Sequence, residues 1–365
     1  MAFGPDMGAR GWPRLLAAVL LLLLVGPGCL KPLPFDEAAW QRRVRATDPA
    51  LLYAPHRRPD GTFFNPWLPR EHSGWSLLRW WASRNTLPPA AAKDIPTPTV
   101  ANDGAYLKDP KAPDSLTWVG HATYVLQWSG QVVVVDPLFS DTVALVRSRL
   151  VPPAFGPQAI PRGAVVLISH NHYDHLDADS VAALAKREAV FLVPLGLGGL
   201  LREMGAQQVR ELDWWQEIKL GGSRFVCLPA QHWSRRLGQG YNQSLWCSWL
   251  AERGGRRIYF GGDSGYFKGF AEIGRRWPGI QLALLGAGAY LPRWFMHYAH
   301  ADVPELFQAT ADLGARFLVP TQWGAFKLGD EPPAWPAQEI RQYMQDNPKW
   351  QGRAILMPVG GRLLL

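Results

Sequence analysis

The chain has 365 residues, of which 47% are apolar and 19% charged, and its formal net charge is +8. This composition excludes an intrinsically disordered chain, and the length is sufficient for one large core and an extension. The positive charge favours acidic partners such as anionic lipids. We expect no nucleic acid partner, because the short basic clusters at 42–43, 256–257 and 275–276 are typical of solvated faces.

Residues 1–29 have the features of an export signal. Arg10 and Arg14 precede an uncharged apolar run at 15–25, and small residues follow that run. The run is too short to cross a bilayer as a stable helix, which needs about 20 residues. Cys29 lies where a bacterial lipoprotein signal has its lipidated cysteine, although Gly26 stands where Leu or Val is usual. We therefore expect an exported, membrane-associated protein, a lipoprotein of the bacterial periplasm or cell envelope.

Residues 30–113 are predicted to form a linker and an extension that is rich in Pro and Trp. Within it, the segment 75–81 (WSLLRWW) predicts a short amphipathic helix that covers the core or touches lipid. Prolines at 88, 89, 96 and 98 end this helix and predict an irregular arm after it.

Residues 114–365 are predicted to form one domain in which strands and helices alternate. We expect helices at 179–187 and 308–313, and strands at 116–128, 131–135, 164–168, 190–193, 224–228, 244–250, 257–261, 282–285 and 316–319. This pattern predicts a layered α/β domain with sheets inside and helices outside. Cys227 and Cys247 lie in two of the apolar segments and form either a disulfide or, as we favour, two buried thiols.

The segment 168–176 (ISHNHYDHL) carries the strongest chemical signal. His170, His172, Asp174 and His175 fall within six residues, directly after an apolar strand. Alternation along an extended backbone puts His170 and His172 on one side, and the turn that follows can bring Asp174 and His175 to a second position. One loop can then supply ligands to two adjacent cations, and imidazole and carboxylate are ligands that zinc, iron and manganese accept.

Two further residues of ligand type follow at strand ends. His232 lies in the segment 229–233 (PAQHW), and Asp263 follows two glycines in 259–265 (YFGGDSG). Glycines let the backbone approach a metal closely. The two oxygens of a single aspartate can bridge two cations.

The order of these residues resembles the metallo-β-lactamase superfamily. That resemblance implies an αββα sandwich, here with an N-terminal Pro- and Trp-rich extension. Over about residues 60–335, the chain looks like the branch of this superfamily that contains the phospholipase D enzymes acting on N-acylphosphatidylethanolamine. The segments that carry this likeness are 118–123 (WVGHAT), 136–139 (DPLF), 211–215 (ELDWW), 229–233, 262–266 (GDSGY), 272–275, 288–290 and 292–296 (PRWFM).

The resemblance implies a site for two metal ions, expected to be zinc, with iron or manganese as alternatives. One ion would be held by His170, His172 and His232, the other by Asp174 and His175, and Asp263 would bridge the two. Asp174 and Asp263 are the candidate catalytic residues.

Other positions are assigned by the same resemblance. Tyr173 and His300 match positions that contact the lipid substrate, whereas His121 and Asp136 match supporting positions. Gln322, in the segment 321–326 (TQWGAF), stands where the family has a further histidine ligand. A glutamine carbonyl is a neutral and weaker ligand, and no histidine follows His300, so we expect the second ion to be loosely held or of another kind.

These residues suggest a phosphodiesterase that acts on membrane lipids. In this hypothesis, a hydroxide held between the two metals attacks the phosphorus of N-acylphosphatidylethanolamine or a related phospholipid, which releases phosphatidic acid and an N-acylethanolamine. The residues expected to face the membrane or the acyl chains are Trp75, Trp80, Trp81, Trp294, Phe295 and Met296. Arg293 could contact the phosphate or form a structural ion pair.

Two alternatives remain at this point. The same fold also carries lactonase and non-lipid phosphodiesterase activities, because function resides in the site and not in the fold. A lipid-binding protein with an attenuated site is the second alternative, and Gln322 is the feature that favours it.

Overall fold

The computed structural model describes residues 31–70, 74–83, 96–144 and 147–365. The predicted export signal with Cys29, and the prolines at 88 and 89, lie outside the described residues. Among the residues that are described, no helix has the length and apolar character needed to cross a membrane.

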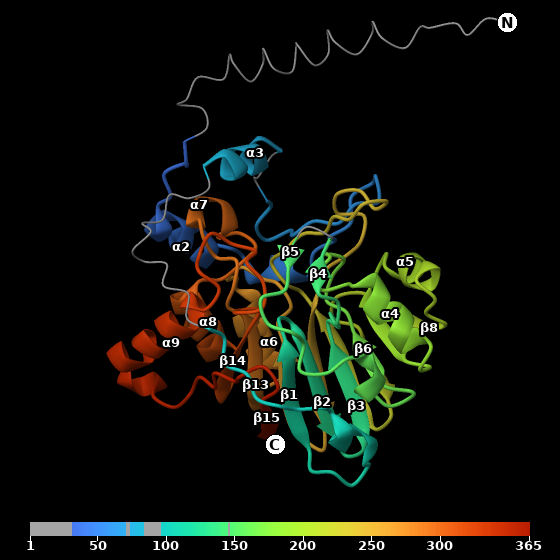
Figure 1. The fold of residues 1–365 in the computed structure, drawn as a ribbon. Coiled ribbons are helices and arrows are strands. Elements are labelled where there is room, and N and C mark those ends of the chain that lie inside the picture. The colour runs from blue at the N-terminus through green and yellow to red at the C-terminus, as the bar shows by residue number, and fades with distance from the viewer. Residues whose placement is uncertain (1–30, 71–73, 84–95, 145–146) are drawn as a thin grey trace, which may run out of the picture.

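Two β-sheets form the centre of the molecule (Figure 1). The first has the strand order β15-β1-β2-β3-β6-β7-β8, with bounds β1 (Ser115–Gly120), β2 (Thr123–Trp128), β3 (Gln131–Val135), β6 (Val165–Leu167), β7 (Val190–Pro194), β8 (Gln208–Leu212) and β15 (Arg362–Leu364). The second has the order β14-β13-β12-β11-β10-β9, with bounds β9 (Glu217–Leu220), β10 (Ser223–Leu228), β11 (Ser248–Arg253), β12 (Arg256–Phe260), β13 (Ile280–Gly286) and β14 (Phe317–Thr321). β4 (Thr142–Val143) pairs antiparallel with β5 (Arg147–Ser148) in a small separate sheet.

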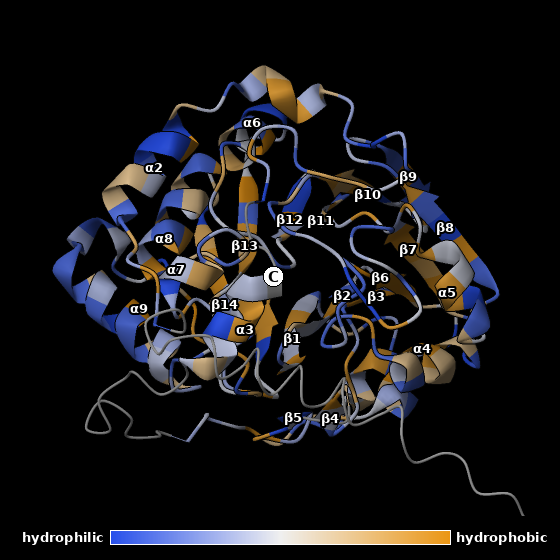
Figure 2. Cartoon of the chain, turned by 90° about the horizontal axis from the view of Figure 1, so that it is seen from above, coloured by the Kyte–Doolittle hydropathy of each residue, from blue (hydrophilic) through white to orange (hydrophobic). Residues whose placement is uncertain are grey.

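Helices cover the outer faces of both sheets, as the view from above shows (Figure 2). The first sheet is covered by α4 (Ala178–Ala185) and α5 (Gly198–Glu203). The second is covered by α6 (Gly269–Arg276), α8 (Val303–Asp312) and α9 (Trp335–Asp346). The other helices of the described residues are α2 (Glu37–Arg45), α3 (Gly74–Ala82) and α7 (Arg293–Met296), together with the short 3₁₀ turns η2 (Pro49–Tyr53), η4 (Ala105–Lys108), η5 (Pro157–Ala159) and η6 (Pro348–Trp350).

Alternation along β3 explains why four layers form. Val133 and Val135 belong to the core between the two sheets, together with Phe225 of the second sheet. Val132 and Val134 point the other way and pack with residues of α4 and α5. Because both faces of the strand are buried at 132–135, its sequence there is uniformly apolar. The predicted αββα sandwich is confirmed.

The N-terminal extension contributes to the main core. Trp40 of α2, Leu52 of η2 and Trp67 are buried in the same apolar cluster as the second sheet. Polar groups join it as well, since Asn65 donates to the hydroxyl of Tyr298 at 2.7 Å. Segment 31–70 is therefore packed onto the domain beside the loops that hold the candidate site.

Three of the predicted elements differ from the structure by a break or by more than two residues at an end. The expected strand 116–128 is a hairpin of β1 and β2, because Gly120 (φ 132°) and His121 (φ 51°) reverse the chain. The strand expected from 244 begins only at Ser248, since the N–H groups of Leu245 and Cys247 donate to loops of the first sheet instead. The helix expected from 308 begins at Val303, where Asp302 forms a capping box with Glu305.

Two other predictions agree with the structure. The segment 75–81 lies in α3, and Cys227 and Cys247 are free buried thiols, as we favoured. Asp177 caps α4 by accepting from the N–H of Ser180 at 3.1 Å.

Candidate metal centre

The predicted ligand residues lie in loops at one edge of the two sheets. The loop that carries His170 to His175 follows β6, His232 follows β10, and Asp263 follows β12. β10 and β12 are both antiparallel to β11, so they run in the same direction and end at the same edge. The topology therefore gathers residues that are up to 93 positions apart, from 170 to 263, into one place.

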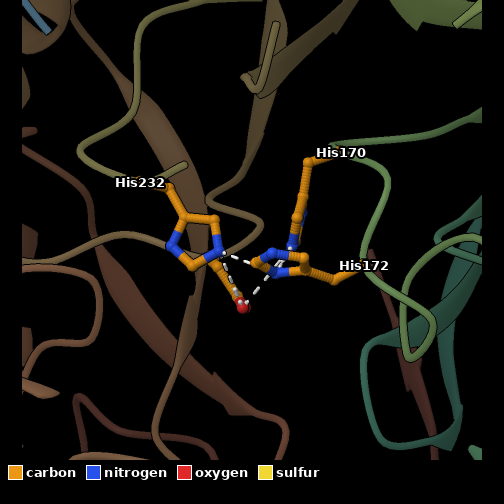
Figure 3. Close-up of side chains that lie close together, drawn as sticks. His170, His172 and His232 are labelled. Atoms are coloured by element: carbon orange, nitrogen blue, oxygen red, sulfur yellow. Dashed lines mark hydrogen bonds and ion pairs between the residues drawn. The ribbon is translucent and has the colours of Figure 1, made fainter. Parts of the chain in front are cut away.

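A first group consists of His170, His172, His232 and Asp263, whose ligand-type atoms all lie within 4.8 Å of one another. Nδ1 of His172 is 2.9 Å from Nε2 of His170 and 3.1 Å from Nε2 of His232. The same two Nε2 atoms are 3.7 and 3.5 Å from Oδ2 of Asp263. Figure 3 shows the three imidazole rings converging.

The hydrogen bonds around the first group leave nitrogen lone pairs directed inward. Nδ1 of His232 donates to the carbonyl of Ala299 at 3.2 Å, so its Nε2 carries the lone pair when the ring is neutral. Nδ1 of His170 lies 2.9 Å from the hydroxyl of Ser169. Several lone pairs that face one another at this distance suit a shared cation.

A second group consists of His121, Asp174 and His175, again within 4.8 Å. Nε2 of His175 is 3.4 Å from Oδ2 of Asp174 and 3.1 Å from Oδ1 of Asp263. Asp263 thus presents Oδ2 to the first group and Oδ1 to the second, which is the arrangement a bridging carboxylate needs.

Asp136 orients His175 of the second group through a hydrogen bond to Nδ1 of its ring. Its Oδ2 accepts from Nδ1 of His175 at 2.8 Å and from the hydroxyl of Ser169 at 2.7 Å, and its Oδ1 accepts from the N–H of Ser169. A carboxylate behind a histidine fixes the tautomer and leaves Nε2 for a ligand. This is a supporting position of the kind expected for Asp136.

Burial and charge set the protonation of the site. Burial lowers the pKa of His170 and His232 well below the usual range, and the pKa of His172 to about 4, so these rings are neutral at pH 7. His175 differs, because Asp263, Asp174 and Asp136 outweigh its burial and raise its pKa well above the usual value. The carboxylates therefore favour positive charge at this point, and a metal cation would satisfy the same preference.

Among the described residues, four buried atoms of the two groups lack the hydrogen bonds that such groups normally make: Nδ1 of His121, Nε2 of His172, Nε2 of His175 and Oδ1 of Asp263. Unsatisfied buried polar groups are rare and require an explanation. An ion between Nε2 of His175 and Oδ1 of Asp263 would provide it for these two atoms, and the residues present therefore fit a metal.

A cavity of about 570 Å³ opens above the two groups. Its floor includes His121, His172, Asp174, Asp263, His300 and Gln322. Its walls are mainly apolar and include Leu77, Trp80, Trp233, Phe295, Met296 and Phe326, with Arg70 and Arg235 as cationic groups. Polar groups at the bottom of an apolar cavity are typical of a ligand site.

The two predicted substrate contacts have different positions. His300 lines the cavity, with its ring centroid 5.5 Å from that of His232. Tyr173 does not line it: its hydroxyl accepts from the N–H of Leu237 at 3.2 Å, and Arg236 lies 4.0 Å from its ring centroid. The tyrosine side chain follows the outside of the ligand loop because the next residue, Asp174, turns inward.

The predicted lipid-facing residues also separate into two sets. Trp75 and Trp81 are exposed on α3, whereas Trp294 and Met296 are each only 7% exposed, so the side chain of Trp294 is core and not membrane surface. Trp80 stacks on Phe295, with ring centroids 5.0 Å apart, and both rings line the cavity.

Arg293 belongs to a buried ion-pair cluster. Its guanidinium donates to Glu305 at 3.0 Å and to Glu37 at 3.2 Å, and lies 3.5 Å from Asp302. The structural ion pair is therefore the correct alternative for this residue. It also joins α2 to the start of α8.

His121 belongs to the second group itself, whereas the sequence interpretation assigned it only a supporting position. The interpretation also missed Arg70 and Glu331, which line the cavity. No spacing in the sequence relates these three residues to the ligand loop. The positive φ at His121 belongs to a turn within 116–128, which the sequence analysis treated as a single strand.

Comparison with known proteins agrees with this geometry. A family described as "Beta-lactamase superfamily domain" matches residues 131–323. A Mycobacterium tuberculosis protein of undescribed function is 35% identical over 89% of both chains. The mitochondrial N-acyl-phosphatidylethanolamine-hydrolyzing phospholipase D of Saccharomyces cerevisiae is 34% identical over 65% of this chain and 52% of its own.

One solved structure illustrates the shared fold. CmlA, a diiron β-hydroxylase from Streptomyces venezuelae, superposes with a TM-score of 0.54 at 21% identity, over 69% of this chain and 54% of its own. At that identity the likeness concerns the fold alone. With the four layers and the paired histidine and aspartate groups, these matches show that the chain belongs to the metallo-β-lactamase superfamily and is a hydrolase of that fold.

Proposed function

We propose that this protein is a metal-dependent phosphodiesterase that hydrolyses N-acylphosphatidylethanolamine, or a related phospholipid, in the manner of a phospholipase D. The observation that carries the proposal is the apolar cavity of about 570 Å³, whose lining includes His172 and Asp263 of the first group and His121 and Asp174 of the second. A lipid must place a polar phosphodiester beside the reacting groups and its acyl chains against apolar walls. The yeast relative acts on such a lipid by its name.

The side chains have distinct roles in this proposal. His170, His172, His232 and Asp263 would hold one cation, and Asp174, His175 and Asp263 the other. Two adjacent cations, when bound, lower the pKa of water from 15.7 to about 7 and stabilise negative charge on phosphate oxygens. Zinc suits these imidazole and carboxylate donors, and iron is an alternative because it accepts the same ligand types.

The cavity walls would orient the lipid. Arg70 and Arg235 offer positive charge to the phosphate near the floor. Arg70 lies 4.2 Å from the ring centroid of Trp233, which holds its guanidinium at the cavity wall. Trp80, Phe295 and Met296 present apolar surface to acyl chains. His300, whose pKa burial lowers, would face the headgroup as a neutral hydrogen-bonding ring.

Membrane placement is part of the same proposal. The exposed residues Trp75, Leu77 and Trp81 of α3 lie beside the cavity that Leu77 and Trp80 line. Tryptophan side chains favour the boundary between lipid and water. An export signal that ends at a lipidated Cys29 would keep the protein at the same surface. A tethered enzyme with an apolar helix would draw its substrate directly from the bilayer.

Product analysis tests the proposed reaction. The metal-loaded full chain is incubated with phosphatidylcholine vesicles that contain N-acylphosphatidylethanolamine, with and without a chelator. We expect release of phosphatidic acid and N-acylethanolamine that the chelator abolishes. Asp263→Asn should lower kcat/KM at least about 100-fold, because even residues behind metal ligands contribute about 10–100-fold. Asp346→Asn, an exposed aspartate at the end of α9, is the matched control and should leave the rate unchanged.

The opposite results have clear meanings. If folded, metal-loaded protein releases neither product, the phospholipase D assignment is wrong and a different ester or phosphodiester must be sought. Binding of the vesicle lipid without turnover would instead favour the lipid-binding alternative. Release that persists in the presence of the chelator and in Asp263→Asn would contradict the metal-dependent mechanism.

A further inference from the structure

His121 is placed at the site by the turn between β1 and β2. Its backbone has φ 51°, a conformation that non-glycine residues adopt rarely and that concentrates at functional sites. Two hydrogen bonds to its carbonyl fix the turn: the indole N–H of Trp118 donates at 2.8 Å and the N–H of Gln322 at 3.2 Å. The chain thus maintains an unfavourable backbone conformation that directs this imidazole into the site.

Among the described residues, the imidazole of His121 makes one side-chain hydrogen bond, and its partner lies inside the candidate metal centre. Its side chain is only 2% exposed, and Nε2 lies 3.1 Å from Oδ2 of Asp174. Nδ1 is buried with no hydrogen-bond partner among the described residues. Among the described residues, the ring therefore has no hydrogen bond that ties it to a structural partner outside the centre. Its ring also faces that of His175, with centroids 5.7 Å apart.

Three of the separations among the proposed ligands of the second cation are close to those expected in a tetrahedral zinc site. Nitrogen and oxygen ligands bound at 2.0–2.1 Å in a tetrahedron lie about 3.3–3.4 Å from one another. The separations are 3.1 Å for His121 to Asp174, 3.4 Å for His175 to Asp174 and 3.1 Å for His175 to Asp263. In the first group, Oδ2 of Asp263 lies 3.5 Å from Nε2 of His232 and 3.7 Å from Nε2 of His170.

Gln322 is committed to other partners. Its Nε2 donates to the carbonyl of Gly262 at 3.1 Å. Its Oε1 lies so close to Gly286 that a Cβ there would be 2.6 Å away. The amide is therefore held between two backbone segments, and its neutral oxygen is a weaker donor than imidazole.

We infer that His121 is a protein ligand of the second cation, together with Asp174, His175 and Asp263, in a chain whose position 322 is glutamine. This rests on the metal-dependent function proposed above. It replaces the expectation that His121 only supports the site. The histidine missing at 322 is supplied from upstream, by the β1–β2 turn.

Metal stoichiometry tests this inference without any substrate. The full chain is dialysed against buffered zinc, and zinc per chain is measured by elemental analysis, with affinities from competition with a chromophoric chelator. We expect about two ions in the wild type and about one in His121→Asn, or at least a tenfold weaker second ion. Asparagine is the first choice because it tolerates positive φ, and His121→Ala is the second variant. The double variant His121→Asn/Gln322→His should regain the second ion.

Controls separate ligand loss from misfolding. His56→Ala removes a histidine that pairs with Asp213 away from the cavity, and it should keep both ions. Near-ultraviolet circular dichroism verifies that each variant is folded. A second ion that binds His121→Asn and His121→Ala as tightly as wild type overturns the inference, and so does a wild type that binds only one ion. Because no lipid is involved, a failed lipid assay leaves this result standing, and an unchanged metal count leaves the proposed reaction standing.

Discussion

At the scale of single residues, the buried carboxyl of Glu331 in the cavity wall makes the stability of the fold depend on pH. Its carboxylate is only 4% exposed and accepts hydrogen bonds from the N–H groups of Ala289 and Leu291. Burial raises its pKa from 4.5 to about 7, and Asp330 contributes in the same direction. A carboxyl whose folded pKa is raised stabilises the fold below its unfolded pKa, and this contribution is lost as pH rises through the folded value. The window is therefore pH 4.5 to about 7.

The direction of this pKa shift predicts how the Glu331→Gln substitution changes the pH dependence of the free energy of unfolding. The free energy of unfolding of the wild type, relative to the variant, should fall between pH 4.5 and 8 by an amount on the order of 3 kcal/mol, at about 1.4 kcal/mol per pKa unit. Urea unfolding midpoints across this range measure it. Glu203→Gln, at an exposed glutamate of α5, is the control and should give a flat difference. A flat difference for Glu331→Gln as well would show that its carboxyl is ionised throughout.

Single residues also show how far the sequence could predict the site. His170, His172, Asp174 and His175 were identifiable because one loop carries them all, and their placement needs only local geometry. His121 could be assigned only a supporting position, because its approach to the site depends on the tight turn after which the chain returns along β1 as β2. Arg293 was ambiguous for a similar reason, since its partner Glu37 lies 256 positions away.

At the scale of elements, α3 is the helix that we expect to contact lipid. Trp75 and Trp81 are 61% and 68% exposed, whereas Trp80 turns inward and stacks on Phe295. Burying each large apolar side chain in a membrane contributes about 1.5–3 kcal/mol. The double variant Trp75→Ser/Trp81→Ser should therefore weaken vesicle binding at least about tenfold, since 1.4 kcal/mol is a factor of ten. Cosedimentation with anionic vesicles measures this.

The control for α3 lies at the other end of the molecule. Leu364 of β15 is 63% exposed, and Figure 1 shows β15 and α3 at opposite ends. Leu364→Ser should bind vesicles as the wild type does, and neither variant should change the hydrolysis of a dispersed short-chain substrate. Equal vesicle binding by the tryptophan variant and the wild type would exclude α3 as the contact.

Elements were predictable where periodicity and end signals agreed. The amphipathic pattern located α3, and apolar runs located most strands. Predicted boundaries were wrong where a tight turn lies inside a predicted strand, as at Gly120, or where a loop is buried without joining a sheet, as before Ser248. In both cases, burial came from tertiary packing that a local pattern does not reveal.

At the scale of the whole molecule, the candidate metal centre connects the two sheets. The loop after β6 belongs to the first sheet, whereas His232 and Asp263 follow strands of the second. Cations held by both would bind the folded chain and not the unfolded one, so their binding adds to the free energy of unfolding. The shared apolar core packs the two sheets together without the cations. Cation binding would add to the free energy of unfolding that this core provides.

This increment can be measured by removing the metal. At a free zinc concentration about 100 times the Kd, binding stabilises the fold by about 2.7 kcal/mol, and each kcal/mol shifts the Tm of a large domain by roughly 2–4 °C. Chelator-treated protein should therefore melt at least about 5 °C lower by calorimetry, and added zinc should restore the Tm. His232→Ala, which removes a ligand from the second sheet, should show a smaller chelator effect. Equal Tm values for zinc-loaded and stripped wild type would mean that no cation is held between the two sheets.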